Sequence, residues 1–493
     1  MVSRFKFVKC RAGMRSKIIN YFICFLLPVF TMAQNYRALH GSPYAGSLGV
    51  HNNPASILHA PYKWDLTLFG AQFKTSTNAI TVVDYSLLSN PANSKYFFNN
   101  GAYKRFADQM VNFNLLNARI AIGKKKAIAF GVNIRGYNNL HTGSFNYIDT
   151  ARTFGDFFKQ NPNTTFQMDQ VHSAMAEFYI TYSQTIFDNS TARLNAGITV
   201  KGGRGISGNQ LSLLNGSVSN TIVNNRPVYT VNNALLQYGY SSNYDRMPQG
   251  GTNNLANFFK YTEGAATIDG GIEFIIKPQE VADYYDDDNF YDYNWKLGLS
   301  ILDAGLANFK YGTESRVASG VKAGITDIQL DNTFDSTITS LKIFNDSLAA
   351  VAGSISNIGG NHFQVINPMR VVLNADRFIY GAFFVNAELS VNIPTGFLKD
   401  YKRVNEINLL TITPRWETRK WGAYLPFSFN TNNQFWIGGA FKAGPLLIGV
   451  HNWSNVFSKK KIQNGGGYIA LVLRAREDVA GKKDRRLNCP TVF

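Results

Sequence analysis

The sequence predicts an all-β fold, an antiparallel transmembrane β-barrel of about 14 strands whose N-terminal segment lies in the lumen as a hatch. Three observations support this prediction. The chain begins with a leader typical of secreted proteins, it is poor in charged residues yet has no second long apolar stretch, and many of its segments alternate apolar and polar residues. Together they indicate a secreted chain that crosses a membrane with strands.

The leader has the three parts of a secretory signal peptide. Basic residues over 4–17 precede an apolar run over 18–30, and the small residues up to Ala33 offer a cleavage site. The apolar run is shorter than the about 20 residues that a spanning helix needs. We therefore expect cleavage near Ala33, with a retained membrane anchor as the alternative and Met14 as an alternative start.

The mature chain stays basic after cleavage. The leader contains six of the 49 Lys and Arg residues and none of the 32 Asp and Glu residues. A basic balance suits lipid phosphates or anionic ligands, and a secretory leader makes nucleic acid an unexpected partner. The leader also contains Cys10 and Cys24, so Cys489 is left alone and can form neither an internal disulfide nor a thiolate zinc cluster.

Composition separates the classes of membrane protein. Charged residues make up 16% of the chain and aromatic residues 14%, whereas a soluble domain averages about 25% charged residues. No apolar stretch after residue 33 is long enough for a spanning helix, which excludes a helical membrane protein. A membrane barrel has this composition, because only every second strand residue faces lipid.

Period-2 alternation marks the strands. Over 194–201 and 383–392, apolar and polar residues alternate for the about 8–10 residues that a tilted membrane strand requires. A soluble β-sandwich would show the same alternation with its apolar face inward, and the lack of a fixed repeat argues against a solenoid. The predicted strands begin near residues 62, 113, 127, 173, 192, 266, 294, 368, 381, 405, 422, 435, 445 and 465.

The connections between these strands fall into two classes, as expected for short periplasmic turns and long outer loops. All six Trp residues lie on or beside strand ends, where aromatic girdles would place them. Within one loop, residues 338–352 place Ile338, Leu341, Leu348 and Val351 on one helical face. The short connections are 124–126, 188–191, 377–380 and 417–421, the long ones are 75–112, 139–172, 205–265 and 304–367, and 278–293 and 432–434 break the rule.

The segment before the first strand is rich in glycine, proline and small residues, which suit a segment folded tightly inside a lumen. It contains Gly46, Gly49 and the triplet Asn53, Pro54 and Ala55. The predicted organisation is a signal peptide over 1–33, a hatch over 34–61, a barrel over 62–478 and a basic tail over 479–493.

Several of these motifs resemble known families. The Gly-x-x-Gly and Asn-Pro-Ala elements resemble the hatch of the long-chain fatty-acid transporter family and of the related PorV-type barrels of Bacteroidota secretion systems. Residues 271–274, 295–305 and 368–370 resemble an uncharacterised Bacteroidota outer-membrane family, a domain of unknown function built on the fatty-acid-transporter type of barrel. The resemblance implies an outer-membrane barrel with a plug and no established substrate.

The sequence lacks several usual signatures of enzymes, including a phosphate-binding loop, His-Glu-x-x-His and Gly-x-Ser-x-Gly. We therefore expect no enzyme, no cofactor and no metal site. His40, His51 and His59 share the hatch and are expected to be polar plug residues rather than metal ligands. A solvated turn is likewise favoured over a calcium site for the acidic cluster Asp283, Asp286, Asp287, Asp288 and Asp292.

A set of charged residues occupies the inward positions of the predicted strands. Charge inside a membrane protein usually marks a water-filled path or a buried pair, so we expect these residues to pair and to fix the hatch in the lumen. The set comprises Lys63, Asp65, Arg119, Arg135, Glu177, Lys201, Asp269, Glu273, Arg370 and Glu388.

Two functions fit this barrel better than an enzyme. The first is passive transport or binding of a small hydrophobic molecule, and a continuous lumen or an opening in the wall would favour it. The second is a secretion-accessory or partner-docking barrel of the PorV type, which a plugged lumen and a broad platform of loops would favour. The expected partners are outer-membrane lipid and lipopolysaccharide, a hydrophobic ligand, and a secreted or periplasmic protein.

Overall fold

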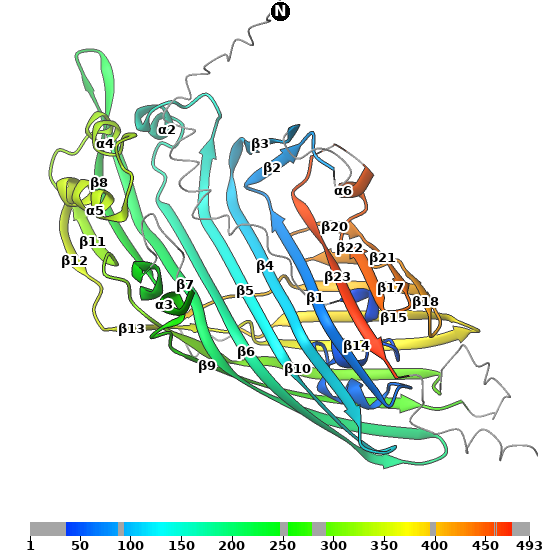
Figure 1. Cartoon of the computed structure of the whole chain (residues 1–493). Coiled ribbons are helices and arrows are strands. Elements are labelled where there is room, and N and C mark those ends of the chain that lie inside the picture. Colours follow the sequence, from blue (N-terminus) through cyan, green and yellow to red (C-terminus); the bar gives the residue numbers. More distant parts are fainter. Residues whose placement is uncertain are drawn as a thin grey trace, which may run out of the picture.

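The chain forms a continuous antiparallel sheet that closes on itself, which confirms the predicted all-β barrel (Figure 1). The first strand of the barrel closes it by pairing with the second barrel strand on one side and with the last strand on the other. Among the described residues, no helix is long and apolar enough to cross a membrane. This computed structural model describes residues 36–86, 93–246, 255–278, 292–394, 401–457, 459 and 461–475.

Three predicted features lie outside the described residues. They are the signal peptide over 1–33, the basic tail over 479–493, and the acidic cluster except for Asp292.

The barrel wall has fourteen strand positions, which we call staves. Two of these staves are interrupted, so that each consists of two short strands. All fourteen predicted strands fall on these staves in the predicted order. The staves are β1 (Trp64–Thr77), β4 (Gly101–Ala121), β5 (Lys126–Tyr147), β6 (Phe166–Asp188), β7 (Ala192–Val223), β9 (Gly264–Ile276), β10 (Trp295–Lys310), β14 (Arg370–Tyr380), β15 (Phe383–Asn392), β17 (Leu409–Glu417), β18 with β19 (Trp421–Tyr424 and Phe427–Asn430), β20 with β21 (Phe435–Ile437 and Gly439–Ala443), β22 (Leu446–Val450) and β23 (Asn464–Arg474).

Apolar side chains face outward and polar side chains face inward. Along β15, Phe383, Val385 and Leu389 are exposed, whereas Asn386 and Glu388 between them are buried. This is the reverse of a soluble β-sandwich, in which the apolar face would be buried. An exposed apolar band around a closed barrel is the surface that a bilayer covers, so the chain is a transmembrane barrel.

Several strands are much longer than the predicted 8–10 residues. β7 has 32 residues, β6 has 23 and β5 has 22. They continue beyond the apolar band at the end of the barrel that carries the long connections, here called the loop end. There both faces of a strand meet water or other loops, so the apolar alternation that reveals a membrane strand is lost although the ladder continues.

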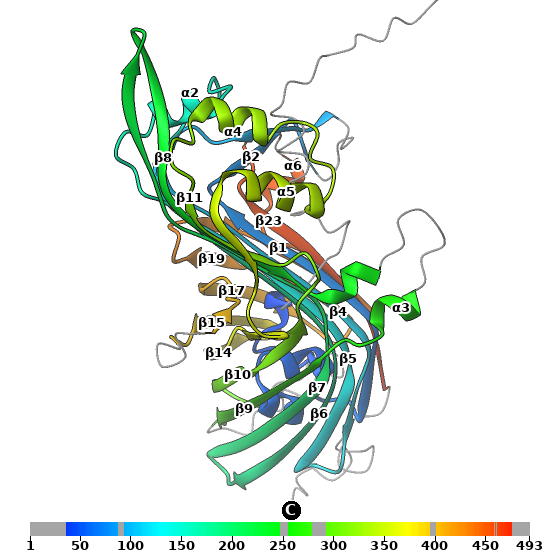
Figure 2. The same cartoon turned by 90° about the vertical axis from the view of Figure 1, so that its left-hand side faces the viewer.

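The loop end also carries several small elements and an apolar core of its own (Figure 2). The predicted helix over 338–352 is confirmed as α5 (Leu341–Val351), with Ser340 as its N-cap and Leu348 and Val351 in this core. The other elements are β2 (Ile80–Val83), β3 (Lys95–Phe98), α2 (Phe154–Lys159), β8 (Arg226–Tyr240), η5 (Ser242–Arg246), α3 (Leu255–Phe259), β11 (Arg316–Val321), α4 (Asp327–Thr333), β12 (Ala352–Asn357), β13 (His362–Ile366), β16 (Lys402–Arg403) and α6 (Ser454–Phe457).

One of the six tryptophans lies beside a strand end as predicted but is not part of an aromatic girdle. Trp64, Trp295 and Trp421 are exposed near the opposite end of the barrel, here called the turn end because the short connections lie there. Trp436, however, is buried at the centre of the short strand β20. Phe435 and Ile437 on either side of it face outward, so the alternation turns the indole of Trp436 inward.

Two isoleucines on β7 test where the bilayer ends. Ile198 lies in the apolar band, whereas Ile222 lies near the tip of the β7–β8 hairpin, and both are exposed. We expect Ile198→Arg to destabilise the barrel in lipid by about 2–4 kcal/mol, because a charge at this depth loses its hydration. Ile222→Arg should change the unfolding free energy by less than about 0.5 kcal/mol. Urea unfolding in phospholipid vesicles measures both, and equal effects would contradict the placement.

Candidate functional site

The hatch, here residues 36–61, lies inside the barrel toward the turn end (Figure 1, dark blue). Its short helices are η1 (Arg37–Leu39), η2 (Gly46–His51) and η3 (Pro54–Leu58). Side chains of at least seven staves bond to it, for example Asp65 of β1, Asn114 of β4, Ser183 of β6, Ser300 of β10, Glu388 of β15, Glu417 of β17 and Arg474 of β23. The hatch is therefore held from nearly all sides of the lumen.

The Asn-Pro-Ala triplet forms the start of η3 and is tied to the wall. The Oδ1 atom of Asn53 accepts a bond from the N–H of Ala55 at 2.9 Å, which caps the helix, while Pro54 occupies its first turn. The Nδ2 atom of Asn53 donates to the carbonyl of Ile272 in β9 at 2.9 Å. One side chain thus fixes the turn and anchors it to the barrel.

Three inward-facing glycines make room for this turn, and we call them the glycine patch. A Cβ on Gly271 would lie 2.2 Å from Oδ1 of Asn53, and one on Gly197 would lie 2.6 Å from the backbone of Pro54 and Ala55. A Cβ on Gly298 would be 3.1 Å from Nδ2 of Asn53. Since β7, β9 and β10 are neighbours, the patch is a stretch of bare backbone against which the hatch packs.

The two hatch glycines have separate roles. Gly46 has a φ of +57°, and a Cβ there would lie 2.6 Å from the carboxylate of Asp65. That carboxylate accepts a bond from the N–H of Ser47 at 2.6 Å. Gly49 faces the Oγ atom of Ser56, 2.7 Å from where its Cβ would be. Both glycines allow a close approach that a side chain would prevent.

Among the predicted lumen residues, Arg119 and Glu388 also bond directly to the hatch. Arg119 donates to the carbonyls of Ile57 and Tyr62 at 2.5 and 2.6 Å. Glu388 accepts a bond from Nδ2 of Asn52 at 2.8 Å and lies 2.5 Å from Nδ1 of His40. Asp65, Arg119 and Glu388 therefore hold three different parts of the hatch.

Most of the other predicted residues form a buried ion network on the loop side of the hatch. Its centre is Asp303, whose Oδ1 atom accepts bonds from Arg135 and Lys201, both at 2.6 Å, and which lies 3.2 Å from Arg370. Arg135 also binds Glu177 at 2.7 Å. Lys201 pairs with Asp269 at 2.8 Å, Arg370 pairs with Glu406 at 2.6 Å, and Lys74 also binds Glu406.

Asp303 was not among the predicted lumen residues, although it belongs to the motif that supports the family resemblance. It lies at a β-bulge in β10, between Ile301 and Ala304, with a left-handed φ of +59°. The bulge changes the alternation, which turns the carboxylate into the lumen. The sequence signal was a charged residue within an otherwise apolar run.

A second network at the turn end was also missed. Arg415 binds Asp376 at 2.5 Å, and Lys442 binds Glu417 at 2.9 Å. Glu417 in turn accepts a bond from Ser42 of the hatch at 2.7 Å. These residues occupy inward positions of β14, β17 and β21, so the same alternation would have identified them.

The structure buries nine of the ten predicted lumen residues, including Glu273, which lies 3.8 Å from Lys296. Lys63 is the exception, because its side chain is exposed. It precedes the first residue of β1, where the strand that would turn it inward has not begun. The inward placement of Lys63 is therefore corrected.

The three hatch histidines lie apart, each with its own partners. His40 is next to Glu388, and His51 lies 3.0 Å from Nδ2 of Asn114 and packs edge-on against Tyr179. His59 binds Asp292, which also pairs with Arg193 at 3.0 Å. No group of three potential metal ligands occurs within the described residues.

An inward-folded loop and an apolar layer lie in the lumen toward the loop end. In the loop, residues 401–408, the N–H of Asn405 donates to Oδ1 of Asn139 at 2.6 Å, and Glu406 joins the ion network. Above the network lies a layer of buried apolar side chains that includes Phe309 and Phe363, whose rings stack 5.1 Å apart. From the turn end to the loop end, the lumen is therefore filled first by the hatch, then by the network of ion pairs and then by the apolar layer.

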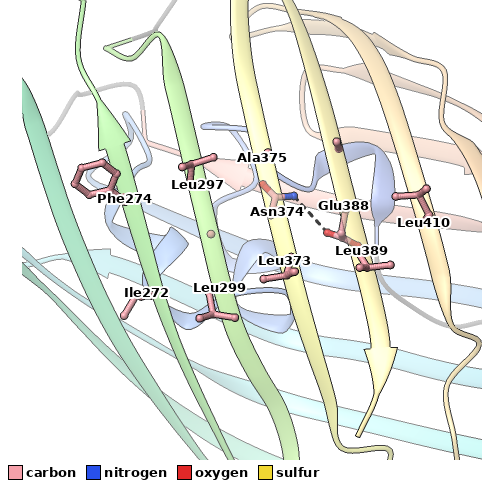
Figure 3. A pocket seen from close by; sticks show the side chains of 12 residues that line it. Ile272, Phe274, Leu297, Leu299, Leu373, Asn374, Ala375, Glu388, Leu389 and Leu410 are labelled. Atoms are coloured by element: carbon pink, nitrogen blue, oxygen red, sulfur yellow. Dashed lines mark hydrogen bonds between the residues drawn. The ribbon is translucent and has the colours of Figure 1, made fainter.

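The outer wall has a depression of about 450 Å³ directly behind this hatch (Figure 3). Its small wall residues are Ala375 of β14 and Ala387 of β15, which are paired in register. Larger apolar side chains surround them, and Gly298, Asn374 and Glu388 lie at the back. The surrounding side chains are Ile272, Phe274, Leu297, Leu299, Leu373, Leu389 and Leu410.

The depression and the hatch meet at the same residues. Glu388 lines the depression and also binds Asn52 of the hatch. Gly298 lines it too, and faces Asn53 on its inner side. A single layer of backbone therefore separates an apolar surface open to the bilayer from the polar anchors of the hatch.

A family model matches residues 54–451, which is most of the chain and contains Pro54 and Ala55 of the Asn-Pro-Ala triplet, the glycine patch and both networks. That model is described as a family of unknown function, DUF5723. The chain belongs to this family. No curated protein sequence matches this DUF5723 member significantly.

Several solved structures resemble this DUF5723 barrel distantly. The toluene transporter TbuX of Ralstonia pickettii is 10% identical, with a TM-score of 0.38, over 87% of this chain and 94% of that one. A FadL homologue of Pseudomonas aeruginosa is 11% identical, with a TM-score of 0.37, over 90% and 98% of the two chains. The toluene transporter TodX of Pseudomonas putida is 10% identical, with a TM-score of 0.35, over 90% and 93%.

Adjacent glycines in β9 test how the hatch is held. Gly271→Ala should push Asn53 away from the wall, whereas Gly270→Ala should be silent because nothing lies within 4 Å of its Cβ position. Overpacking of this kind costs about 1–3 kcal/mol, so we expect the amides of residues 53–59 to exchange hydrogen at least about fivefold faster in Gly271→Ala. Hydrogen exchange with mass spectrometry measures this. Equal exchange in the two variants would contradict the packing.

Proposed function

We propose that the protein is an outer-membrane barrel that binds a small hydrophobic molecule in the wall depression and supports its passive movement between bilayer and lumen. The observation that carries this proposal is the depression itself. It is apolar, it opens toward the bilayer, and its volume of about 450 Å³ falls in the range of about 300–1,000 Å³ found for ligand sites.

The chemistry of the lining indicates the class of ligand. Leucine, isoleucine and phenylalanine side chains form the rim, so a mainly apolar molecule would gain most by binding there. Asn374 and Glu388, which are within 3.5 Å of each other, lie at the back. Both lie behind the layer of backbone that forms the wall, so the depression offers a ligand apolar contact and almost no polar partner.

The filled lumen supports a route through the wall rather than along the barrel axis. An apolar molecule moving along the axis would have to displace the buried pairs around Asp303, and breaking a buried pair is costly. Movement past Gly298 and Glu388 instead meets the hatch at the bonds of Asn52 and Asn53. A ligand that competes for Glu388 would loosen the hatch at that point.

The outer-membrane location rests on the predicted leader together with the barrel. A chain exported by a signal peptide and crossing a membrane only with strands satisfies its backbone hydrogen bonds by closing the sheet. Lipopolysaccharide and outer-membrane lipid are then its expected surroundings, and the turn end with its short connections would face the periplasm.

A partner-docking barrel of the PorV type stays the second proposal. The observations that favour it are the filled lumen and the loop end, where the β7–β8 hairpin and α2, α4 and α5 stand above the barrel (Figure 2). In that case a secreted or periplasmic protein would bind the chain without any hydrophobic ligand in the wall.

Filling the depression tests the first proposal. The double variant Ala375→Leu, Ala387→Leu adds bulk on the lipid side and leaves the lumen unchanged. In outer membranes exposed to a diazirine-bearing fatty acid, we expect wild-type chains to be photolabelled on β10, β14 and β15. The double variant should lose at least about fivefold of this labelling, corresponding to about 1 kcal/mol of binding.

The matched control is Ala196→Leu with Ala423→Leu, two outward alanines that are not among the residues lining the depression. This control should be labelled like the wild type. Equal labelling of both double variants, or labelling spread evenly around the barrel, would overturn the proposed binding site. A partner protein captured by cross-linking together with that result would favour the docking alternative.

A further inference from the structure

On β7, β9 and β10, the outward-facing side chains change from apolar to basic at one height along the barrel axis. Outward residues of β7 run from Ile198 and Val200, both exposed and apolar, through Gly202 to the exposed Arg204. Together with Leu194 and Ala196 before it, this stretch has the about 9–11 residues that a tilted strand needs to cross the hydrocarbon core. Arg204 therefore lies where the apolar band ends on the loop side.

Neighbouring strands place more cations at or just above this level. Arg204 is paired with Gly264, at the start of β9, and donates to the carbonyl of Thr262 at 2.6 Å. Lys260 precedes this strand and is exposed. On the other side of β9, Asn308 of β10 donates to the carbonyl of Gly264 at 2.9 Å, and the exposed Lys310 follows two residues later.

These cations are accompanied by exposed aromatic rings. Phe259 of α3 is 47% exposed and Tyr261 is 67% exposed, although each is large and apolar. The ammonium of Lys260 lies 5.0 Å from the centre of the Tyr261 ring. Figure 2 shows α3 beside the barrel rather than over its mouth. Rings and cations in this position are typical of the membrane interface, where the ring meets acyl chains and the cation meets phosphate.

The nearby acidic residue cancels only part of this charge. Glu263 lies 3.2 Å from His362, which is paired with Lys310 across β10 and β13. Glu263 supplies one negative charge against the three cations Arg204, Lys260 and Lys310, which leaves a surplus of positive charge along the edge of the apolar band. We name these three residues, with Phe259 and Tyr261, the basic rim.

We infer that the basic rim binds the phosphate-bearing headgroup of a lipid in the leaflet at the loop end. The apolar band holds the acyl chains below, and the cations lie one strand position above it, where headgroup phosphates are. This inference requires a bilayer around the barrel but does not depend on any ligand in the wall depression, so the two proposals fail separately.

The test uses purified full-length protein in detergent micelles, titrated with bisphosphorylated lipid A or with the same lipid after removal of both phosphates. Native mass spectrometry counts the lipids bound per chain. Basic residues near a membrane surface contribute about 1 kcal/mol each, so the double variant Lys260→Ser, Lys310→Ser should bind bisphosphorylated lipid A at least about tenfold more weakly than the wild type.

The matched control is Lys159→Ser with Lys342→Ser, which removes two exposed lysines from α2 and α5, on the loops above the barrel. It should bind like the wild type, and the lipid without phosphates should bind weakly to every variant. Equal binding by the two double variants, or equal binding of the lipid with and without phosphates, would overturn the inference. Displacement of the lipid by millimolar inorganic phosphate alone would also overturn it, since it would indicate a site for free phosphate.

Discussion

The ion pairs around Asp303 are the interaction on which the rest of the lumen depends. A barrel that faces lipid has to satisfy its inward charges within the lumen, because the bilayer offers them no partner. Asp303 alone meets three cations from β5, β7 and β14, and so ties together staves that are far apart in sequence. With the lumen fixed in this way on the loop side, the hatch is left to fill the turn side, where Asp65, Arg119 and Glu388 hold it.

The position of the hatch also explains the glycine patch and the depression in the barrel wall. The hatch packs closely where the glycine patch exposes backbone, and the same part of the barrel carries small outward residues at Ala375 and Ala387. Close packing inside and small side chains outside produce a thin wall next to Glu388. The proposed binding of a hydrophobic molecule and its effect on the hatch both follow from that thinness, because Glu388 belongs to the depression and to the anchor of Asn52.

The period-2 alternation predicted the staves well because lipid imposes it physically: an outward polar residue in the apolar band loses its hydration. It failed where that condition ends. The long extensions of β5, β6 and β7 beyond the band and the exposed Lys63 before β1 lie outside the region that lipid constrains.

The partners inside the lumen were beyond the reach of a single sequence. Arg135 and Asp303 are 168 residues apart, and a bulge hides the inward direction of Asp303. The hatch motif was visible as Asn-Pro-Ala, but its glycine partners on β7, β9 and β10 are recognisable only once the strands are side by side. Nor does alternation reveal the depression, which depends on the relative sizes of outward side chains on five neighbouring strands.

The hatch is held in the lumen against the wall, and an engineered disulfide tests this placement most directly. The Oγ atom of Ser47 in η2 lies 2.9 Å from Oγ1 of Thr67 in β1, whereas Thr411 of β17 bonds to Ser428 instead. In a Cys489→Ser background, Ser47→Cys with Thr67→Cys should form a cross-link in intact outer membranes, and Ser47→Cys with Thr411→Cys should not. Free, maleimide-reactive thiols in the first pair would contradict the account, because the hatch would then lie away from the wall.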